Sequence, residues 1–116
     1  MTFLGRVLVT GAGGFIGHHL SSRLVKQGYW VRGADLKPPE FERTRAHEFE
    51  LLDLRRLDAC LQAARGVDEV YHLAANMGGI GFIESAKAEI SRDNVLIDTH
   101  MLEAARIHGE IGRAHV

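Results

Sequence analysis

The feature that most constrains this chain is a glycine-rich turn close to its N-terminus. Residues 7–9 form a short apolar run, typical of a buried strand, and Gly11, Gly14 and Gly17 follow at intervals of three. Residues 18–27 then repeat apolar side chains at helical spacing. Glycines at these positions allow a tight turn, a close approach of the backbone to a phosphate, and close packing of the helix on the strand, respectively. Because a helix N-terminus also offers free N–H groups, the segment predicts a pyrophosphate cradle.

A carboxylate follows at the distance that a dinucleotide site requires. The next predicted strand ends at Asp35, 18 residues after Gly17, where an acid hydrogen-bonds the ribose hydroxyls of the adenosine half. Such an acid repels a 2′-phosphate, which favours NAD over NADP. Arg32 and Lys37 are near enough in sequence to pair with that phosphate, so this choice stays open. The rival phosphate loop, which ends in Gly-Lys-Ser/Thr, is absent because His18 follows Gly17.

Length and composition indicate one small soluble domain. The 116 residues carry a net charge of −1, so nothing favours a nucleic-acid partner. No apolar stretch is long enough for a membrane span, and the N-terminus lacks the pattern of a signal peptide. Cys60 is the only cysteine and has no internal disulfide partner, so we expect a cytoplasmic location. No metal site is predicted.

Strand patterns alternate with helical patterns, which predicts an α/β fold with a parallel sheet and helices on both faces. Strands are expected at Arg6–Thr10, Trp30–Ala34, Glu48–Leu52 and Glu69–Leu73; helices are expected at Ile16–Gln27, at Leu54–Ala64 and within Ser91–His108, with a shorter helical turn in Ile83–Ala88. Right-handed crossovers give the strand order 3-2-1-4, the N-terminal part of a Rossmann-type doubly wound, three-layer αβα sheet. The fourth strand then lacks its usual fifth neighbour, so we expect an apolar edge that self-associates.

The chain divides into two parts of unequal length. Residues 1–109 are expected to form an incomplete NAD-binding Rossmann domain. Residues 110–116, Glu-Ile-Gly-Arg-Ala-His-Val, follow a finished helix and show no convincing strand pattern. They also match the in-frame translation of a common sequencing adapter. We therefore expect a non-native tail and a truncated reading frame.

Two further sites are expected at the carboxyl ends of later strands. Asp53 ends the third strand, where its carboxylate can accept a hydrogen bond from an adenine amino group while Leu54 packs on the ring. An equally good interpretation is that Asp53 caps the next helix. The fourth strand ends at 73–75 with small residues, which let a nicotinamide ribose lie close to the backbone; tight strand–helix packing explains Ala75 as well. We expect His72 to be a packed strand residue.

As a set, these motifs resemble the extended short-chain dehydrogenases/reductases, the NAD-dependent nucleotide-sugar epimerase/dehydratase family. The residues that carry the resemblance are Thr10-Gly11-x-x-Gly14-x-x-Gly17, Asp35, Asp53-Leu54, His72-Leu73-Ala74-Ala75 and Asn94. The runs Asn76–Ser85, Asp93-Asn94 and Met101–Arg106 are similar to the GDP-mannose 3,5-epimerase group, which has a Met-Gly-Gly-x-Gly-Phe-Ile loop. The resemblance covers nearly all of residues 6–109. The glycines of that loop expose backbone where substrate meets cofactor; a flexible loop without chemistry is the alternative.

The resemblance implies a cofactor, a substrate and a set of site residues. NAD would be held by Gly11, Gly13, Gly14, Phe15, Ile16, Gly17, Asp35, Asp53, Leu54, Leu73, Ala74 and Ala75. Gly78 would touch a nucleotide sugar, with GDP-mannose the expected class, and a homodimer would form through two long helices of each subunit. Asn94 would support the active site, or be a simple exposed or capping asparagine.

The implied reaction is a transient oxidation of the sugar at C4, followed by epimerisation and return of the hydride. The family's Tyr-x-x-x-Lys pair is absent, because Gly33 follows Tyr29 by four residues and Ala75 follows Tyr71. No catalytic residue is therefore predicted here, and we expect the chain to bind cofactor without turnover. The alternatives are another nucleotide-sugar 4-epimerase or 4,6-dehydratase, and a non-catalytic dinucleotide sensor.

Overall fold

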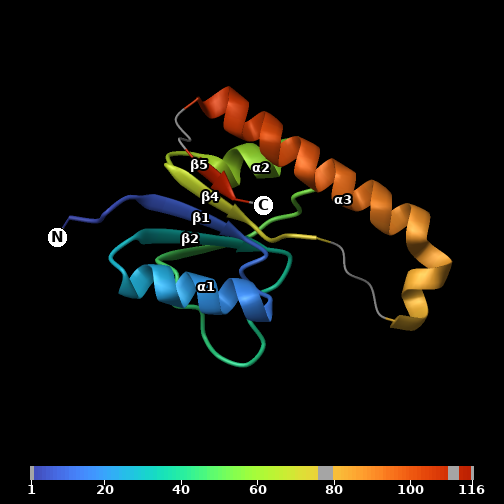
Figure 1. The fold of residues 1–116 in the computed structure, drawn as a ribbon, viewed down its shortest axis with the longest axis horizontal. Coiled ribbons are helices and arrows are strands. Elements are labelled where there is room, and N and C mark those ends of the chain that lie inside the picture. The colour runs from blue at the N-terminus through green and yellow to red at the C-terminus, as the bar shows by residue number, and fades with distance from the viewer. Residues whose placement is uncertain (1, 76–79, 110–112, 116) are drawn as a thin grey trace.

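The protein folds into a twisted sheet with helices on both faces, as the computed structural model in Figure 1 shows. The structure describes the backbone of residues 2–75, 80–109 and 113–115, and the side chains of residues 2–75 and 92–109. The strands are β1 (Arg6–Thr10), β2 (Trp30–Asp35), β3 (Glu48–Leu51), β4 (Glu69–His72) and β5 (Arg113–His115), and the helices are α1 (Phe15–Lys26), α2 (Leu57–Ala64) and α3 (Ile80–His108).

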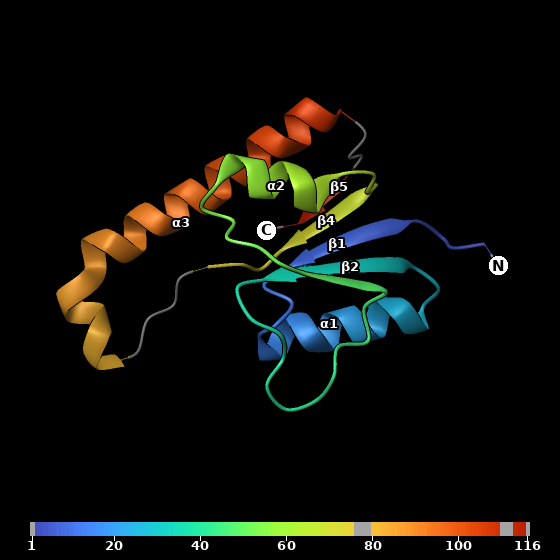
Figure 2. The ribbon, with the colours of Figure 1, turned by 180° about the vertical axis from the view of Figure 1, so that it is seen from behind.

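The sheet is parallel, with the order β3-β2-β1-β4-β5. This confirms the predicted fold class and the order 3-2-1-4 of the first four strands. Figure 2 shows α1 on one face, with α2 and α3 together on the other. The carboxyl ends of the strands therefore meet at one edge of the sheet, beside the glycine turn.

Two apolar clusters hold these layers together. Val7, Val9 and Val31 point to the α1 face and pack with Leu24 of that helix. Leu8 points to the opposite face and packs with a cluster from α2 and α3, including Ala59, Cys60, Ala63, Ile97, Met101 and Ala104. Burial on both faces explains why β1 has a continuous apolar sequence without alternation.

The structure corrects two expectations about the helices. The third helix is one continuous helix from 80 to 108, so the separate turn expected at 83–88 is part of it. The second helix begins at Leu57, three residues later than predicted, because residues 53–56 form a turn closed by a hydrogen bond from Arg56 N to Asp53 O.

The expectation that residues 110–116 would not form a strand is wrong. Residues 113–115 pair with β4 as a parallel strand, in the position where a fifth strand is expected. The physical reason is that an unpaired strand edge accepts almost any extended segment, because the pairing is made by backbone groups. None of the helices in the described part of the chain is long and apolar enough to cross a membrane.

Candidate functional site

A cleft of about 740 Å³ opens at the carboxyl ends of the first four strands. Its volume lies within the range of small-molecule sites, about 300–1,000 Å³, and its position is where open α/β sheets bind ligands. It is lined by Gly11, Gly14, Asp35, Leu36, Lys37, Leu52, Asp53, Leu54, Arg55, Leu73, Ala74, Ala75, Asp93 and Ile97. Eight of the predicted site residues are in this lining: Gly11, Gly14, Asp35, Asp53, Leu54, Leu73, Ala74 and Ala75.

The glycine turn has the geometry that a phosphate cradle needs. Gly11 has φ +71°, and a Cβ there would lie 2.8 Å from the carbonyl carbon of Leu73. A Cβ on Gly17 would overlap the Gly11 carbonyl oxygen, so this glycine lets α1 pack against the turn. A Cβ on Gly14 would meet only the Gly11 oxygen, at 3.4 Å. Gly14 is therefore not required by the protein's own packing, and its bare backbone faces the cleft.

The N-terminus of α1 is left available to an external anion. Gly14 is the N-cap and makes no side-chain cap, and the first turn contains no acidic residue. Phe15 and Ile16 do not line the cleft, and their side chains are 65% and 71% exposed. The prediction for Phe15 and Ile16 therefore concerns their backbone N–H groups, which point out of the helix along its axis.

Asp35 is fixed in place directly beside this turn. Its Oδ2 accepts a hydrogen bond from Gly13 N at 2.8 Å, and its Oδ1 accepts one from Leu36 N at 2.6 Å. A Cβ on Gly13 would overlap the Lys37 carbonyl oxygen, so the turn and the end of β2 fit together only with glycine there. The acid and the phosphate cradle are thus parts of one assembly, although Gly13 itself is not in the cleft lining.

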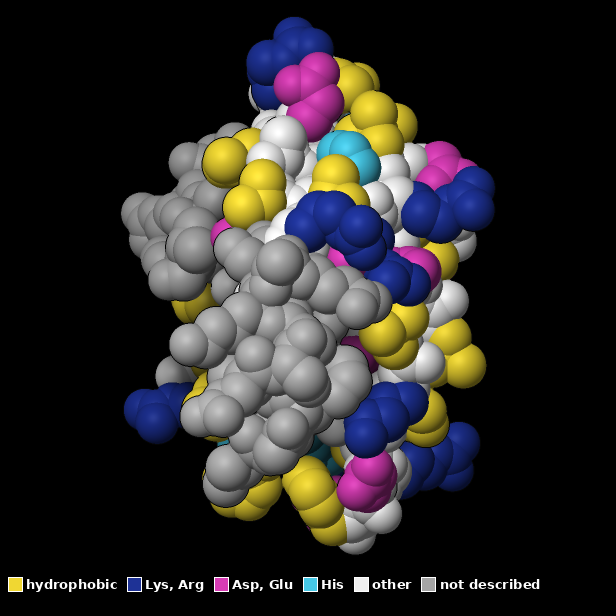
Figure 3. Space-filling view, turned by 90° about the vertical axis from the view of Figure 1, so that its right-hand side faces the viewer, with side chains coloured by type: hydrophobic (Ala, Val, Ile, Leu, Met, Phe, Trp, Pro, Cys, Tyr) yellow, Lys and Arg dark blue, Asp and Glu magenta, His cyan; other side chains and the backbone are white. Residues whose placement is uncertain are grey.

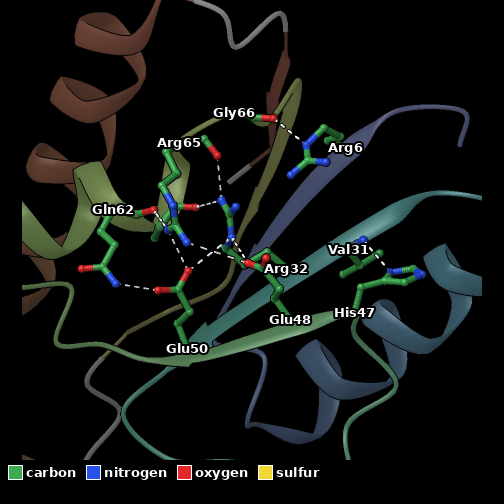
Figure 4. A network of polar contacts seen from close by, with 10 residues as sticks. Arg6, Val31, Arg32, His47, Glu48, Glu50, Gln62, Arg65 and Gly66 are labelled. Carbon is green, nitrogen blue, oxygen red and sulfur yellow. Dashed lines mark hydrogen bonds and ion pairs between the residues drawn. The ribbon is translucent and has the colours of Figure 1, made fainter.

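The two basic residues near Asp35 have different environments. Figure 4 shows Arg32 inside a network, where its Nε donates to Glu48 (2.9 Å) and its Nη1 donates to the carbonyls of Ala63 (2.8 Å) and Arg65 (2.7 Å). Its side chain is 3% exposed. The hypothesis that Arg32 pairs with a 2′-phosphate is therefore wrong, because its charge is used inside the fold.

Lys37 is the basic residue of that pair that lines the cleft. It pairs with Glu40, Nζ to Oε1 at 2.7 Å, and this hydrogen bond raises the pKa of the lysine. The positive charge beside Asp35 is thus already partly neutralised by a neighbouring carboxylate, which leaves Asp35 as the dominant fixed charge at this end of the cleft.

Asp53 lies in the cleft and does not cap a helix. The N-cap of α2 is Arg56, so the capping interpretation of Asp53 is wrong. Its carboxylate instead pairs with Arg55, with Nε–Oδ1 at 2.9 Å and Nη2–Oδ2 at 2.7 Å, and Oδ1 also accepts Arg55 N at 3.1 Å. The hydrogen bonds from Arg55 hold the pKa of Asp53 below its usual value. Leu54, beside it, is 4% exposed and belongs to the core.

Two residues of α3, Asp93 and Ile97, line the cleft and were not predicted from the sequence. Asp93, which is buried, lies 3.6 Å from Arg55 Nη1, and His100 Nδ1 donates to Arg55 O at 2.7 Å. Both contacts join segments about 40 residues apart, so no local pattern predicts them.

Figure 3 views the molecule from the side that the strands point toward, and on the described part of this face basic and acidic side chains lie next to each other.

Residues 73–75, which line the cleft, are held in place by a series of hydrogen bonds that runs through Thr10 and His72. Thr10 Oγ1 accepts from Leu73 N (2.9 Å) and Ala74 N (3.1 Å), and contacts His72 Nδ1 at 2.7 Å. Because the hydroxyl already accepts twice, it donates to Nδ1, which leaves Nε2–H to donate to Asp98 Oδ1 at 2.9 Å. His72 is 8% exposed and is a packed strand residue, as predicted.

Two predicted residues are not placed in the cleft. Gly78 lies outside the described residues. Asn94 lies on α3, is half-buried and is not in the cleft lining. Its supporting role stays a prediction.

The sequence profile described as "NAD dependent epimerase/dehydratase family" matches residues 7–115. The chain belongs to this family. The membership confirms the resemblance drawn from the motifs and the prediction of NAD as the cofactor.

Individual relatives agree with the family assignment. This epimerase/dehydratase chain is 49% identical over 106 residues to GDP-mannose 3,5-epimerase 1 of Oryza sativa subsp. japonica, covering 90% of the chain. It is 45% identical to GDP-mannose 3,5-epimerase of Arabidopsis thaliana over the same length. The chain spans 28% of the length of each of these relatives.

Solved structures share the fold. A short-chain dehydrogenase/reductase superfamily protein from Agrobacterium tumefaciens with bound NAD matches with a TM-score of 0.74 and 31% identity, over 90% of this chain and 30% of that chain. MoeE5 in complex with UDP-glucose and NAD matches with a TM-score of 0.78 and 33% identity, over 95% of this chain and 35% of that one.

Proposed function

We propose that this chain is the NAD-binding part of a nucleotide-sugar epimerase of the GDP-mannose 3,5-epimerase type. The observation that carries the proposal is that the glycine turn before the uncapped start of α1 is joined to the carboxylate of Asp35, at one cleft, by a 2.8 Å hydrogen bond from Gly13 N. One group attracts a diphosphate and the other accepts from ribose hydroxyls, so together they fit the two halves of a dinucleotide.

Each part of the cleft has a proposed partner in the cofactor. Backbone N–H groups at Phe15 and Ile16 bind the pyrophosphate beside the bare backbone of Gly14, whose own N–H donates to Gly11 O, and Asp35 binds the adenosine ribose. Asp53 and Leu54 bind the adenine, and residues 73–75 leave room for the nicotinamide ribose. Gly11, Gly13 and Gly17 act indirectly, by letting the turn, the end of β2 and α1 come together. When bound, NAD would supply the hydride acceptor that a transient oxidation of the sugar at C4 requires.

The substrate and the chemistry belong to the whole protein. The identity to GDP-mannose 3,5-epimerases supports a GDP-mannose-class sugar, with Gly78 contacting it and Asn94 supporting the active site. The 116 residues contain no Tyr-x-x-x-Lys pair, so we expect the chain alone to bind NAD without turning over substrate. Another nucleotide-sugar 4-epimerase or 4,6-dehydratase is the second candidate, and the likeness to a UDP-galactose 4-epimerase structure, with a TM-score of 0.75 and 32% identity, supports the 4-epimerase. A non-catalytic dinucleotide sensor would bind NAD equally well and is distinguished by the absence of turnover in the whole protein.

Assembly and boundaries are also proposals. On α3, Val95, Leu102 and Ile107 are 60%, 65% and 49% exposed, which suits a helix that pairs with a second subunit in a homodimer. We propose that residues 1–109 form the native, incomplete Rossmann domain and that 110–116 are a non-native tail that occupies the free edge of β4. The cytoplasmic location stays a prediction.

The direct test is the affinity of the 116-residue chain for NAD and NADP, measured by isothermal titration calorimetry. We expect NAD to bind more tightly, and the Asp35→Asn variant to lose roughly tenfold in NAD affinity and most of its preference over NADP, because one acceptor and the negative charge are lost. The matched control is Asp58→Asn, an exposed carboxylate on α2 paired with Arg56 outside the cleft lining. Absence of NAD binding by the unmodified chain, with a native circular dichroism spectrum, would contradict the proposal.

A further inference from the structure

Arg55 holds the Asp53 carboxylate at one end of the cleft. Four hydrogen bonds of 2.7–3.2 Å run from Arg55 to the Asp53 carboxylate, three from the guanidinium and one from the backbone N–H. Both residues line the cleft. The carboxylate is therefore a group with a fixed direction, even though its side chain is 32% exposed.

Arg55 is in turn held from α3. Its Nη1 lies 3.6 Å from Asp93 Oδ2, whose side chain is 6% exposed, and its carbonyl accepts from His100. A guanidinium that lies between two carboxylates is attracted to both, which limits its freedom to turn away from Asp53. The Asp53–Arg55 pair is thus braced against the long helix.

A fixed, ionised carboxylate distinguishes purines by their exocyclic group. It only accepts hydrogen bonds, so it binds the amino group of adenine and is repelled by the carbonyl oxygen that hypoxanthine has at the same position. A carboxylate that is free to turn has another option, because the ring N–H of hypoxanthine, next to that carbonyl, is also a donor. Selectivity for adenine therefore depends on holding the carboxylate in one direction as well as on its charge.

We propose that Arg55 is a positioning residue that makes this cleft selective for adenine dinucleotides, by fixing the direction of the Asp53 acceptor. The inference rests on the proposed binding of NAD in the cleft. Hydrogen bonds from Arg55 also lower the pKa of Asp53, which favours the ionised form of the acceptor. The side chain of the neighbouring Arg56 pairs with Asp58 outside the cleft lining and makes no hydrogen bond to the Asp53 carboxylate, so it lowers the pKa of Asp53 only through its charge and does not fix its direction.

The test compares NAD with nicotinamide hypoxanthine dinucleotide by calorimetry. For the unmodified 116-residue chain we expect NAD to bind at least about tenfold more tightly than the hypoxanthine dinucleotide. This is the effect of one hydrogen bond that adenine makes and that hypoxanthine replaces with a repulsion. Arg55→Met should reduce this ratio to less than about threefold, while the control Arg56→Met leaves it unchanged. A loss of fold would weaken both dinucleotides alike, so the ratio reports on positioning and not on stability.

Further variants separate the possible failures. Asp53→Asn should also remove the selectivity, because an amide can turn either its oxygen or its nitrogen to the base, and the double variant should lose nothing more. If Arg55→Met keeps the ratio, or the unmodified chain binds both dinucleotides equally, the proposal is overturned while the site for a dinucleotide stands. If the folded chain binds neither dinucleotide, the proposed function fails as well.

Discussion

The two glycines at the start of α1 give a sharp prediction, because adding one methyl group at each should damage different properties. At Gly17 the new Cβ would overlap the Gly11 carbonyl oxygen and lie 2.8 Å from Gly11 C and 2.9 Å from Ala12 Cα. All three are backbone atoms, so α1 must move away from the turn. Overpacking of this kind costs about 1–3 kcal/mol, and the gain in helix propensity from alanine returns less than about 1 kcal/mol. We expect Gly17→Ala to lower the free energy of unfolding by about 2 kcal/mol and the Tm by about 10 °C.

Gly14→Ala is the matched control for stability. Its Cβ would lie 3.4 Å from the Gly11 oxygen, an ordinary contact, and would point into open space where we place the pyrophosphate. We expect its Tm to stay within a few degrees of the unmodified chain while its NAD affinity falls at least tenfold. Thermal unfolding followed by circular dichroism, together with calorimetric titration of both variants, gives the four values. If Gly14→Ala binds NAD as tightly as the unmodified chain does, or Gly17→Ala has the same Tm as that chain, the assignment of roles within the turn is wrong.

Three other predictions concern a buried thiol, a buried arginine and the Asp53–Arg55 pair. Burial raises the pKa of the Cys60 thiol to about 12, so we expect no reaction with a disulfide reagent at pH 8 until denaturant is added; rapid labelling of the folded chain would contradict this. Replacing Arg32 with Met leaves buried carbonyls and Glu48 without their donor, and should lower the free energy of unfolding in urea by about 3 kcal/mol; a loss below about 1 kcal/mol would contradict this. Since Arg55 lowers the pKa of Asp53, ionised Asp53 stabilises the fold above its unfolded pKa, about 3.9, and this contribution disappears as the pH falls through the lower folded value. The difference in Tm between the unmodified chain and Arg55→Met should therefore shrink between pH 5 and pH 3, and a constant difference would refute this linkage.

The parts of the fold that the sequence predicts well depend on short segments. The strand–turn–helix unit from residue 6 to 26 follows from glycine spacing and apolar pattern, and Asp35 follows from the length of one βαβ unit. The strand order needs only the handedness of crossovers. These predictions succeed because each depends on local chemistry plus one general rule of topology.

What the sequence could not predict depends on contacts between distant segments. Arg32 has a side chain that could bind a phosphate, yet its guanidinium donates hydrogen bonds to backbone carbonyls at the end of α2 inside the fold. Asp93 reaches the cleft, and His100 reaches the Arg55 carbonyl, only because α3 packs behind the Asp53–Arg55 turn. The strand at 113–115 has no pattern of its own, and its pairing is determined by the open edge of β4.

The central claim is that the backbone amides at the start of α1 and the carboxylate of Asp35 at the end of β2 bind one dinucleotide. The most direct measurement is a titration of ¹⁵N-labelled chain with NAD, followed by amide chemical shifts. We predict saturable shifts for the amides of Gly13, Gly14, Phe15, Ile16 and Leu36, with those of the distant strand residue Arg6 unmoved. Shifts that spread over other surfaces and spare the glycine turn, or a spectrum that NAD leaves unchanged, would contradict the account.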